Sequence, residues 1–373
     1  MIVILVIASA LAYLLPQFTY VGPEEETEDR FFTIVLTTTY ENRNGEGALW
    51  NFTEDDTVAS LFMNSSWQTV CLTNSSYPIE RAGIDADGNP QAFMSFPESR
   101  LDSGKNLSFE VAYRIVLKPR SVPEFTEEGS GSLSDIPEDL RSLYCSSVGP
   151  WQMDDQRLQD LASELAGNET RVLTALRKFI EWTRDNIGRE TLDVPRYPVE
   201  TFQGRAGDCD DQANLFITLC RITGIPAYLQ AGCIYVSSKH TTISSWNGCL
   251  INELTRIAWH GWAVVYVPPW GWLPVDFTYV TLGDLRADAL NAIRLSAIIA
   301  HPTVQYANFT ATDYIAACRD RRDFQVAHGF YIYGHDVMSE ETVGEGAGTA
   351  ASILPIVPLL ILHVLPSTPA QRG

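Results

Sequence analysis

One segment, residues 207–233, constrains the fold of this chain more than any other. Apolar residues recur at helical spacing between 213 and 222. Asp208 is a favourable N-cap residue, and Asp211 stands three positions later, where an acidic capping partner belongs. Gly224, followed closely by a proline, is a typical helix end. The pattern predicts a helix that begins directly after Asp208.

Cys209 is the first residue of that predicted helix. A thiol attacks only as its thiolate, which needs a nearby cation or the positive end of a helix. The unpaired N–H groups of a first turn favour an anion by up to about 1 kcal/mol, and they can also stabilise an oxyanion. Asp208, Asp210 and Asp211 oppose the thiolate with their negative charge. A protonated His260 would compensate for them.

Residues 259–279 alternate like two strands around a turn that is rich in proline and glycine, which predicts a β-hairpin. A four-residue loop at 268–271 would leave His260 and Asp276 on opposite faces of the sheet. A five-residue loop centred on Pro268 would pair them directly, with their Cβ atoms roughly 4.5 to 5.5 Å apart. We expect the second register, in which Asp276 fixes the tautomer of the imidazole.

These pieces closely resemble the transglutaminase-like superfamily, in its order: a G-x-C helix start, a GIPA helix exit, an H-x-W strand and the strand GWLPVDFT. The resemblance covers roughly residues 155–285, including two helices before the cysteine. It implies an α+β fold with a papain-like core, in which helices pack on an antiparallel sheet. It also implies that Cys209 is the nucleophile, His260 the base and Asp276 the orienting carboxylate.

The resemblance leaves the second oxyanion donor open. Gln203 lies six residues before Cys209, as a glutamine does in papain-like enzymes, and Trp182 is the alternative. Either residue can equally be structural. The aromatic residue that many relatives carry after the second helix is absent at Gly188. Tryptophans are frequent around the hairpin, and we expect Trp262 and Trp272 in the core. We expect the others to line a groove for an extended peptide: Trp246, Trp259 and Trp270.

The expected activity is attack on amide bonds of peptides or proteins through a thioester. Hydrolysis is favoured over transamidation, because excluding water from an open site requires lids that the sequence does not reveal. The alternatives are a catalytically silent module of the cell envelope that binds peptides or glycans, and a structural envelope protein. We expect no cofactor. We also expect no zinc, because the C-x-x-C and H-E-x-x-H patterns are absent.

Both ends of the chain carry apolar segments. Residues 2–21 have no charged side chain and about the length of a bilayer span, ~20 residues, so we expect an N-terminal anchor or signal segment within 1–22. Residues 347–365 predict a second anchor, although two prolines interrupt it. The net charge of −20 argues against nucleic acid as a partner. The expected location is a membrane-anchored protein with its catalytic body outside the cytoplasm.

Six N-x-S/T sequons support an exterior location. They are Asn51, Asn64, Asn74, Asn106, Asn168 and Asn308. In an oxidising exterior, Cys233 and Cys249 are close enough in sequence to form a disulfide, whereas Cys220, on the apolar helix face, is expected to be buried and free.

Around the core, the sequence predicts further parts. Residues 30–120 contain short strand-like runs between turns, which indicates a β-sandwich-like domain. Within it, DADGN at 85–89 is expected to be a turn rather than a calcium loop. The complete expected order is 1–22 anchor or signal, 30–120 β domain, 121–150 linker, 151–285 catalytic core, 286–340 extension with a helix at about 285–300, and 347–365 anchor.

Overall fold

The computed structural model describes residues 28–45 and 47–341. The two predicted terminal anchors lie outside these ranges, so they remain predictions. Within the described ranges, no helix is both long enough and apolar enough to cross a bilayer.

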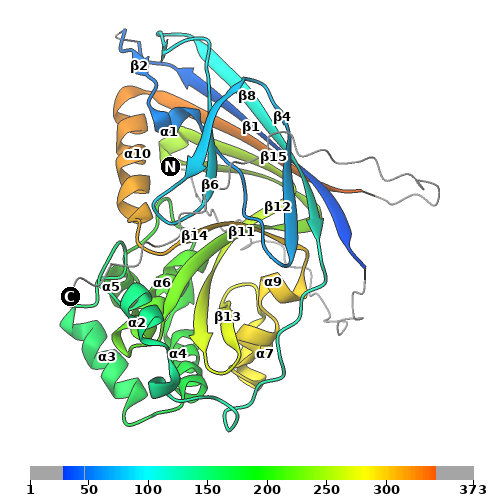
Figure 1. Cartoon of the computed structure of the whole chain (residues 1–373). Coiled ribbons are helices and arrows are strands. Elements are labelled where there is room, and N and C mark those ends of the chain that lie inside the picture. Colours follow the sequence, from blue (N-terminus) through cyan, green and yellow to red (C-terminus); the bar gives the residue numbers. More distant parts are fainter. Residues whose placement is uncertain (1–27, 46, 342–373) are drawn as a thin grey trace, which may run out of the picture. The chain divides into compact units, whose positions relative to one another are not determined.

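The fold is α+β, as expected, and is organised around one large mixed sheet (Figure 1). Its eight strands lie in the order β14, β11, β12, β15, β1, β8, β4, with β13 paired to β12. Neighbouring strands are antiparallel except for β12 and β15, which run parallel. The bounds are β14 (Thr303–Phe309), β11 (Ala227–Ser245), β12 (Leu250–Val267), β15 (Phe330–Glu340), β1 (Arg30–Asn42), β8 (Asn106–Leu117), β4 (Gln68–Ser75) and β13 (Gly271–Val275).

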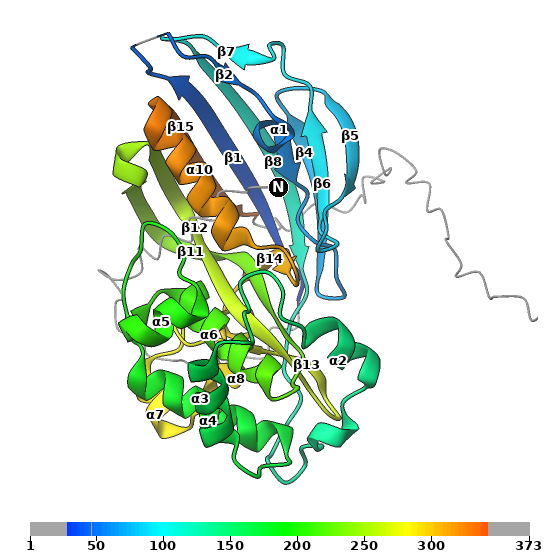
Figure 2. The ribbon, with the colours of Figure 1, turned by 90° about the vertical axis from the view of Figure 1, so that its left-hand side faces the viewer.

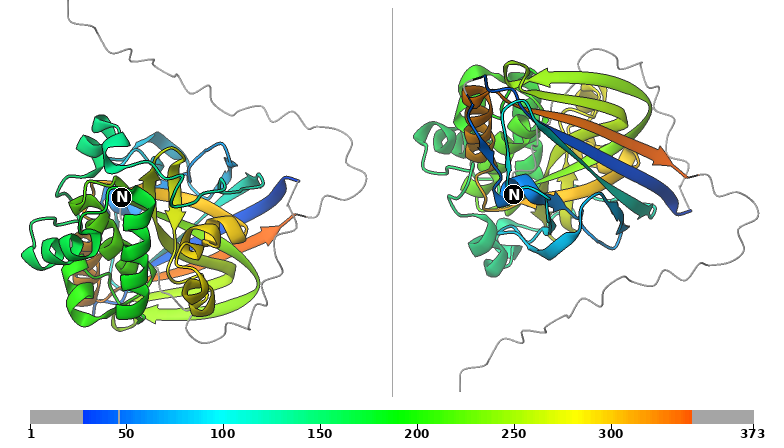
Figure 3. Two further views of the ribbon diagram at one scale, coloured as in Figure 1. Left: turned by 90° about the horizontal axis from the view of Figure 1, so that it is seen from below. Right: turned by 90° about the horizontal axis from the view of Figure 1, so that it is seen from above.

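Helix α6 (Cys209–Ile222) is the centre of the helical layer. It contacts β11 and β12 on one side and three other helices on the others, so nearly all of its side chains are buried. The three are α3 (Gln156–Ala166), α4 (Val172–Asn186) and α5 (Pro198–Gly204). Figure 3 shows these green helices on one side of the yellow-green strands. The helix that the apolar residues at 213–222 predict is therefore stabilised by the sheet on one side and by helices on the others.

The N-terminal strands fall into several sheets. Besides β1, β4 and β8, a three-stranded sheet contains β3 (Val58–Ser60), β6 (Pro90–Met94) and β5 (Ile79–Ile84), and a two-stranded one contains β2 (Trp50–Asn51) and β7 (Arg100–Leu101). In the sequence, α1 (Glu54–Thr57) lies between β2 and β3. Helix α10 (Tyr314–His328) lies along β15 (Figure 2). Because β15 pairs with both β1 and β12, the expected boundary at residue 120 divides one hydrogen-bonded sheet. The domain limits stay a prediction.

The segment 121–150, expected as a linker, contains a short 3-10 helix (Leu133–Asp135) and α2 (Glu138–Tyr144). The loop at 85–89 is the predicted turn, since Asp85 Oδ1 accepts hydrogen bonds from the N–H groups of Asp87 and Asn89 at 2.9 and 2.8 Å.

The expected single helix at 285–300 is wrong. The chain instead forms three short helices, α7 (Leu282–Ala287), α8 (Asn291–Arg294) and α9 (Ala297–Ala300). Asp288 interrupts the run because its Oδ1 accepts the N–H of Leu290 at 3.0 Å, which offers the backbone an alternative to helical bonding.

The expected register of the β12–β13 hairpin is also wrong. Val267 pairs with Gly271 and Ala263 with Val275, so the loop is three residues long rather than five. Gly271 has φ of +86° and takes the left-handed position that commonly closes such a loop. The observed register differs from the expected one by two residues, which keeps His260 and Asp276 on the same face as diagonal rather than direct neighbours.

The suggested bridge between Cys233 and Cys249 is excluded. The β11–β12 hairpin is long, and Cys233 lies opposite Trp259, ten residues along β12 from Cys249. At ~3.3 Å per residue, the two cysteines are about 33 Å apart. Cys220 is fully buried and free, as expected.

Candidate active site

Cys209 is the first residue of α6, and Asp208 is its N-cap. The predicted capping contact is present, because Asp211 Oδ2 accepts the N–H of Asp208 at 3.1 Å. Directly before the helix, β10 (Ala206–Gly207) pairs in parallel with β9 (Gly188–Arg189). The thiol therefore lies at a helix start that is anchored on both sides, and it is only 4% exposed.

His260 and Asp276 form a buried pair. His260 Nε2 lies 2.8 Å from Asp276 Oδ2, and both residues are 1% exposed. Three backbone N–H groups also donate to Asp276: Ala297 to Oδ2 at 3.0 Å, and Thr278 and Tyr279 to Oδ1 at 3.0 and 3.1 Å. With four donors, the carboxylate is fixed, and it occupies Nε2 of the imidazole. Nδ1 is the nitrogen left for another partner.

A gap in strand pairing brings the cysteine to the histidine strand. On one edge, β12 pairs with β15 over 250–255 and with β13 over 263–267, but the described strands leave 256–262 unpaired there. Helix α6 packs against β12, and the N–H of Gly261 is close enough to the thiol of Cys209 to lower its pKa. The sulfur thus lies beside the residue that directly follows His260.

The pKa values of Asp276 and Cys209 are shifted in opposite directions. Burial alone would raise the pKa of Asp276, but the charge and hydrogen bond of His260, together with the N–H groups, lower it to about 2. Burial, and then the charges of Asp208 and Asp210, raise the pKa of Cys209 well above its ordinary value. The site therefore holds an ionised Asp276 and a neutral resting thiol.

The three aspartates around the thiol are themselves buried. Burial and the neighbouring carboxylates raise the pKa of Asp208 well above its usual range and that of Asp211 to about 7. Asp210 is stabilised by the hydroxyl of Tyr314, which donates to its Oδ2 at 2.8 Å. The ligand atoms of Asp208, Cys209 and Asp210 all lie within 4.8 Å of one another, a spacing that can hold a metal ion.

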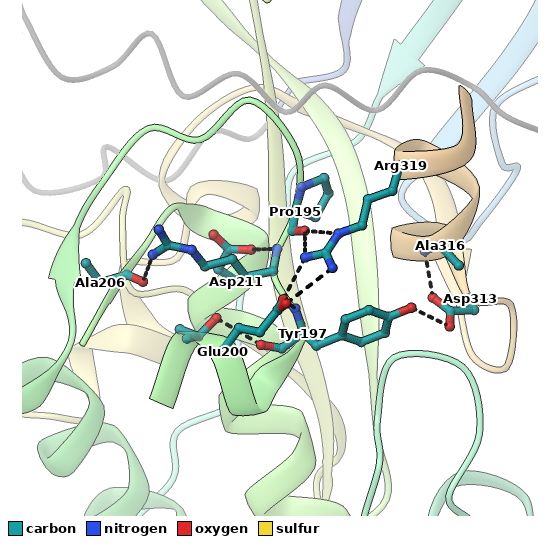
Figure 4. Close-up of polar contacts among 10 residues, drawn as sticks. Pro195, Tyr197, Glu200, Ala206, Asp211, Asp313, Ala316 and Arg319 are labelled. Atoms are coloured by element: carbon teal, nitrogen blue, oxygen red, sulfur yellow. Dashed lines mark hydrogen bonds and ion pairs between the residues drawn. The ribbon is translucent and has the colours of Figure 1, made fainter. Parts of the chain in front are cut away.

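A network of arginines fixes the segment between β9 and α6 (Figure 4). The N–H of Arg196 donates to Asp211 Oδ1 at 2.7 Å, which ties the segment to the first turn of α6. From α10, Arg319 donates to the carbonyl of Pro195 at 2.9 Å and to Glu200 Oε2 at 2.6 Å. Contacts with α6 and with α10 thus fix the segment that leads to Cys209.

Among the contacts of the described residues, none joins Trp182 or Gln203, the two proposed oxyanion donors, to Cys209. Trp182 stacks on Phe202, with 5.9 Å between ring centroids, and on Arg205. Gln203 is exposed on α5. A role for either at the oxyanion stays a prediction.

The three groove tryptophans have different surroundings. Trp246 is 0% exposed, which corrects its expected place in an open groove, and its indole N–H donates to the carbonyl of Asp193 at 3.0 Å. Trp259 is half-buried, donates to Asp336 Oδ2 at 2.7 Å and, as a strand neighbour of His260, points to the opposite face. Trp270 is half-buried at the hairpin turn.

Arg189 is a site residue that sequence reasoning missed. Its backbone pairs with Gly207, two residues before Cys209, while its guanidinium donates to the carbonyl of Thr278, two residues after Asp276. No local motif marks it, because only the β9–β10 pairing brings it to the cysteine.

Five of the six sequon asparagines are exposed, namely Asn51, Asn64, Asn74, Asn106 and Asn168. Asn308 is half-buried in β14, where its Oδ1 accepts from Gln230 at 2.7 Å.

The three residues of the site lie within a segment that matches a known family. The sequence model of the family described as "Transglutaminase-like superfamily" matches residues 159–277, which contain the cysteine, the histidine and the aspartate. No curated protein matches the chain in sequence.

Two solved structures resemble the fold. A candidate cysteine protease from Cytophaga hutchinsonii has 18% identity and a TM-score of 0.48, with 84% of this chain and 90% of that chain covered. The periplasmic domain of TgpA from Pseudomonas aeruginosa has 16% identity and a TM-score of 0.33, with 74% and 93% covered. Residues 159–277, about a third of the chain, are therefore similar to the transglutaminase-like superfamily.

Proposed function

We propose that the protein is a cysteine-type amide hydrolase that acts on peptides or proteins through a thioester on Cys209. The observation that carries the proposal is the buried His260–Asp276 pair, 2.8 Å apart, in which His260 lies on the strand whose Gly261 N–H is next to the Cys209 thiol. Such a geometry supplies a nucleophile, a base and an orienting carboxylate within one family core.

The proposed reaction begins with a neutral thiol. His260 takes the proton of Cys209 on Nδ1 as the sulfur attacks the substrate carbonyl, and Asp276 stabilises the imidazolium through Nε2. The backbone N–H groups at the start of α6 are the proposed oxyanion donors. His260 then protonates the leaving amine, the C–N bond breaks, and a thioester with Cys209 remains.

Water resolves the thioester in the favoured route. His260 takes a proton from the water, the hydroxide attacks the thioester carbonyl, and Cys209 leaves as the acid product is released. A primary amine in place of water would give a new amide, which is transamidation.

The test is an isotope experiment on a mixture of unrelated peptides in water enriched in ¹⁸O. We expect the wild-type protein to yield shorter peptides whose new carboxyl groups carry ¹⁸O, and Cys209→Ala to yield none. Adding a primary amine such as glycinamide distinguishes the two routes by product mass. Peptides cleaved equally by both proteins, or by neither, would contradict the proposal. Amide products in place of acids would replace hydrolysis with transamidation.

A second candidate is a catalytically silent module that binds peptides or glycans. One observation favours it: burial and the charges of Asp208 and Asp210 raise the pKa of Cys209, which disfavours the thiolate. This candidate predicts that Cys209→Ala binds the same ligands as the wild type and that neither protein turns them over.

The location is part of the proposal. We infer a membrane-anchored protein with its catalytic body outside the cytoplasm, supported by the apolar sequences at 2–21 and 347–365 and by the five exposed sequons. Mass spectrometry of the protein purified from its own cells would detect glycans at those asparagines, and their complete absence would remove that support.

A further inference from the structure

Arg189 is the positive charge that the structure brings to the nucleophile. Its Cα pairs with Gly207 in the β9–β10 ladder, which fixes the backbone beside the start of α6. Its guanidinium reaches the other half of the site and donates to the carbonyl of Thr278. One arginine thus connects the segment that carries Cys209 with the segment that carries Asp276.

The environment of Arg189 leaves it able to bind a further group. The residue is exposed, and among the described residues no carboxylate lies within ion-pair distance of it. Partial desolvation lowers the pKa of Arg189, whereas the negative charge of Asp276, and that of Cys209 when it is ionised, act in the opposite direction. An arginine remains charged through such a shift. The guanidinium has five N–H donors, and one suffices for the carbonyl of Thr278.

Arg189 differs from most arginines of the protein in the charges around it. The protein has a net charge of −20, and three aspartates surround the thiol. Most arginines in the described ranges are paired with a carboxylate of the chain, as Arg196 is with Glu190 and Arg319 with Glu200. An exposed arginine without such a partner, beside the nucleophile, matches an anion that arrives with the substrate.

We propose that Arg189 binds a carboxylate of the peptide substrate next to the scissile amide, so that the site selects acidic peptides. This inference rests on the proposed function and deepens it. The guanidinium holds the carboxylate through paired N–H···O bonds, and this contact places the neighbouring carbonyl near Cys209.

Two alkylating reagents test the proposal without a known substrate. Iodoacetate carries a carboxylate, iodoacetamide is its neutral counterpart, and mass spectrometry measures the labelling rate of Cys209 with each. In the wild type, we expect the ratio of the iodoacetate rate to the iodoacetamide rate to exceed that of the unfolded chain. In Arg189→Gln, we expect the ratio to fall about tenfold, the effect of losing one charge-assisted contact.

Two further variants sharpen the result. Arg189→Lys keeps the charge but loses the planar fork, so it should retain part of the preference. Arg286→Gln removes an exposed arginine from α7 and should leave the ratio unchanged. A ratio that is the same in Arg189→Gln and wild type overturns the proposal. Equal slowing with both reagents also overturns it, because the arginine would then act on the thiolate and not on a carboxylate.

Binding separates the failure of this proposal from the failure of the proposed function. If Cys209 reacts with neither reagent, the nucleophile of the proposed function is refuted, and peptide binding to Cys209→Ser decides the role of Arg189. The probes are fluorescein-labelled Ala-Ala-Glu-Ala-Ala amide, its Gln counterpart, and the Gln peptide with a free C-terminal carboxylate. Tighter binding of either acidic probe that is lost in Arg189→Gln supports the proposal and identifies the carboxylate. Equal binding of all three overturns it.

Discussion

Two sets of interactions act in opposite directions on the ionisation of Cys209. The helix start and the N–H of Gly261 favour a thiolate, whereas burial and the charges of Asp208 and Asp210 favour a thiol. In the resting protein, burial and the aspartates have the larger effect, so Cys209 is a thiol. The thiolate must therefore form as the proton moves to His260, and the aspartates lower the fraction of thiolate.

Replacing Asp208 by Asn tests that balance. Asn is an equally good N-cap, so the helix start should be kept while an ionisable carboxyl group near the sulfur is removed. We expect iodoacetamide to label Cys209 roughly threefold to tenfold faster at neutral pH, with the rate–pH curve moved to lower pH. Asp185→Asn, on the exposed end of α4, is the matched control. Unchanged or slower labelling would show that Asp208 does not oppose the thiolate.

Asp276 combines an electrostatic and a structural role. Asp276→Ala leaves the N–H groups of Thr278, Tyr279 and Ala297 without their acceptor, at about 1–3 kcal/mol for each buried donor. We expect a large fall in thermal stability. Asp276→Asn keeps one acceptor oxygen, so it should unfold at a higher temperature than the Ala variant and still lose reactivity at Cys209, because its amide disturbs the tautomer of His260. Equal stability of Asp276→Ala and wild type would contradict the observed hydrogen bonds.

At the scale of elements, local chemistry was predictable and long-range pairing was not. The start of α6 follows from Asp208 and Asp211, which act within one turn. The hairpin register depended on one backbone choice at Gly271, which the residue pattern does not determine. Arg189 was missed because β9 has two residues and meets β10 only through the tertiary fold.

The approach to the site depends on α10. Arg319 connects this helix to Pro195 and Glu200 (Figure 4), so Arg319→Ala should free the segment that leads to α6. We expect faster amide hydrogen exchange over residues 190–204, with exchange in β1 and β8 unchanged. Arg322→Ala is the control, since the one ion pair of Arg322 within the described ranges is with its exposed neighbour Asp323. Identical exchange in the two variants would contradict this role of α10.

In the whole molecule, β15 joins residues that are about 300 positions apart in sequence, because it pairs with β1 and also with β12. The alternation of apolar and polar residues predicted strands in both regions, but it contains no information about which strand pairs with which. The buried ion pair between Arg321 of α10 and Asp56 of α1, 2.6 Å apart, adds a second connection that the sequence did not indicate.

The buried carboxyl groups set how stability depends on pH. Burial raises the pKa of Asp211 to about 7 and that of Asp336 to about 6, whereas an unfolded Asp titrates near 3.8. The folded state therefore binds these protons more tightly, and their contribution to stability falls as the pH rises from about 4 to about 7. Asp276, with a pKa of about 2, has the opposite sign and contributes above about pH 4.

We expect the melting temperature to fall between pH 5 and pH 7, and to fall less in Asp336→Asn. The difference corresponds to at most about 3 kcal/mol for a shift from 3.8 to about 6. Asn can still accept the indole N–H of Trp259, so the fold should be kept. Calorimetry at four pH values checks this, and a melting temperature that rises through the same range in the wild type would contradict it.

The central claim is that His260 activates Cys209, and the labelling rate of Cys209 tests it most directly. Iodoacetamide labelling is followed by mass spectrometry across pH 6–10 for wild type and His260→Ala, with circular dichroism to confirm folding. We expect the His260→Ala change to slow labelling at neutral pH at least about tenfold, because the proposed acceptor of the thiol proton is then missing. Equal rates in the two folded proteins would mean that Cys209 and His260 do not act together, and the account of this protein as a cysteine hydrolase would be wrong.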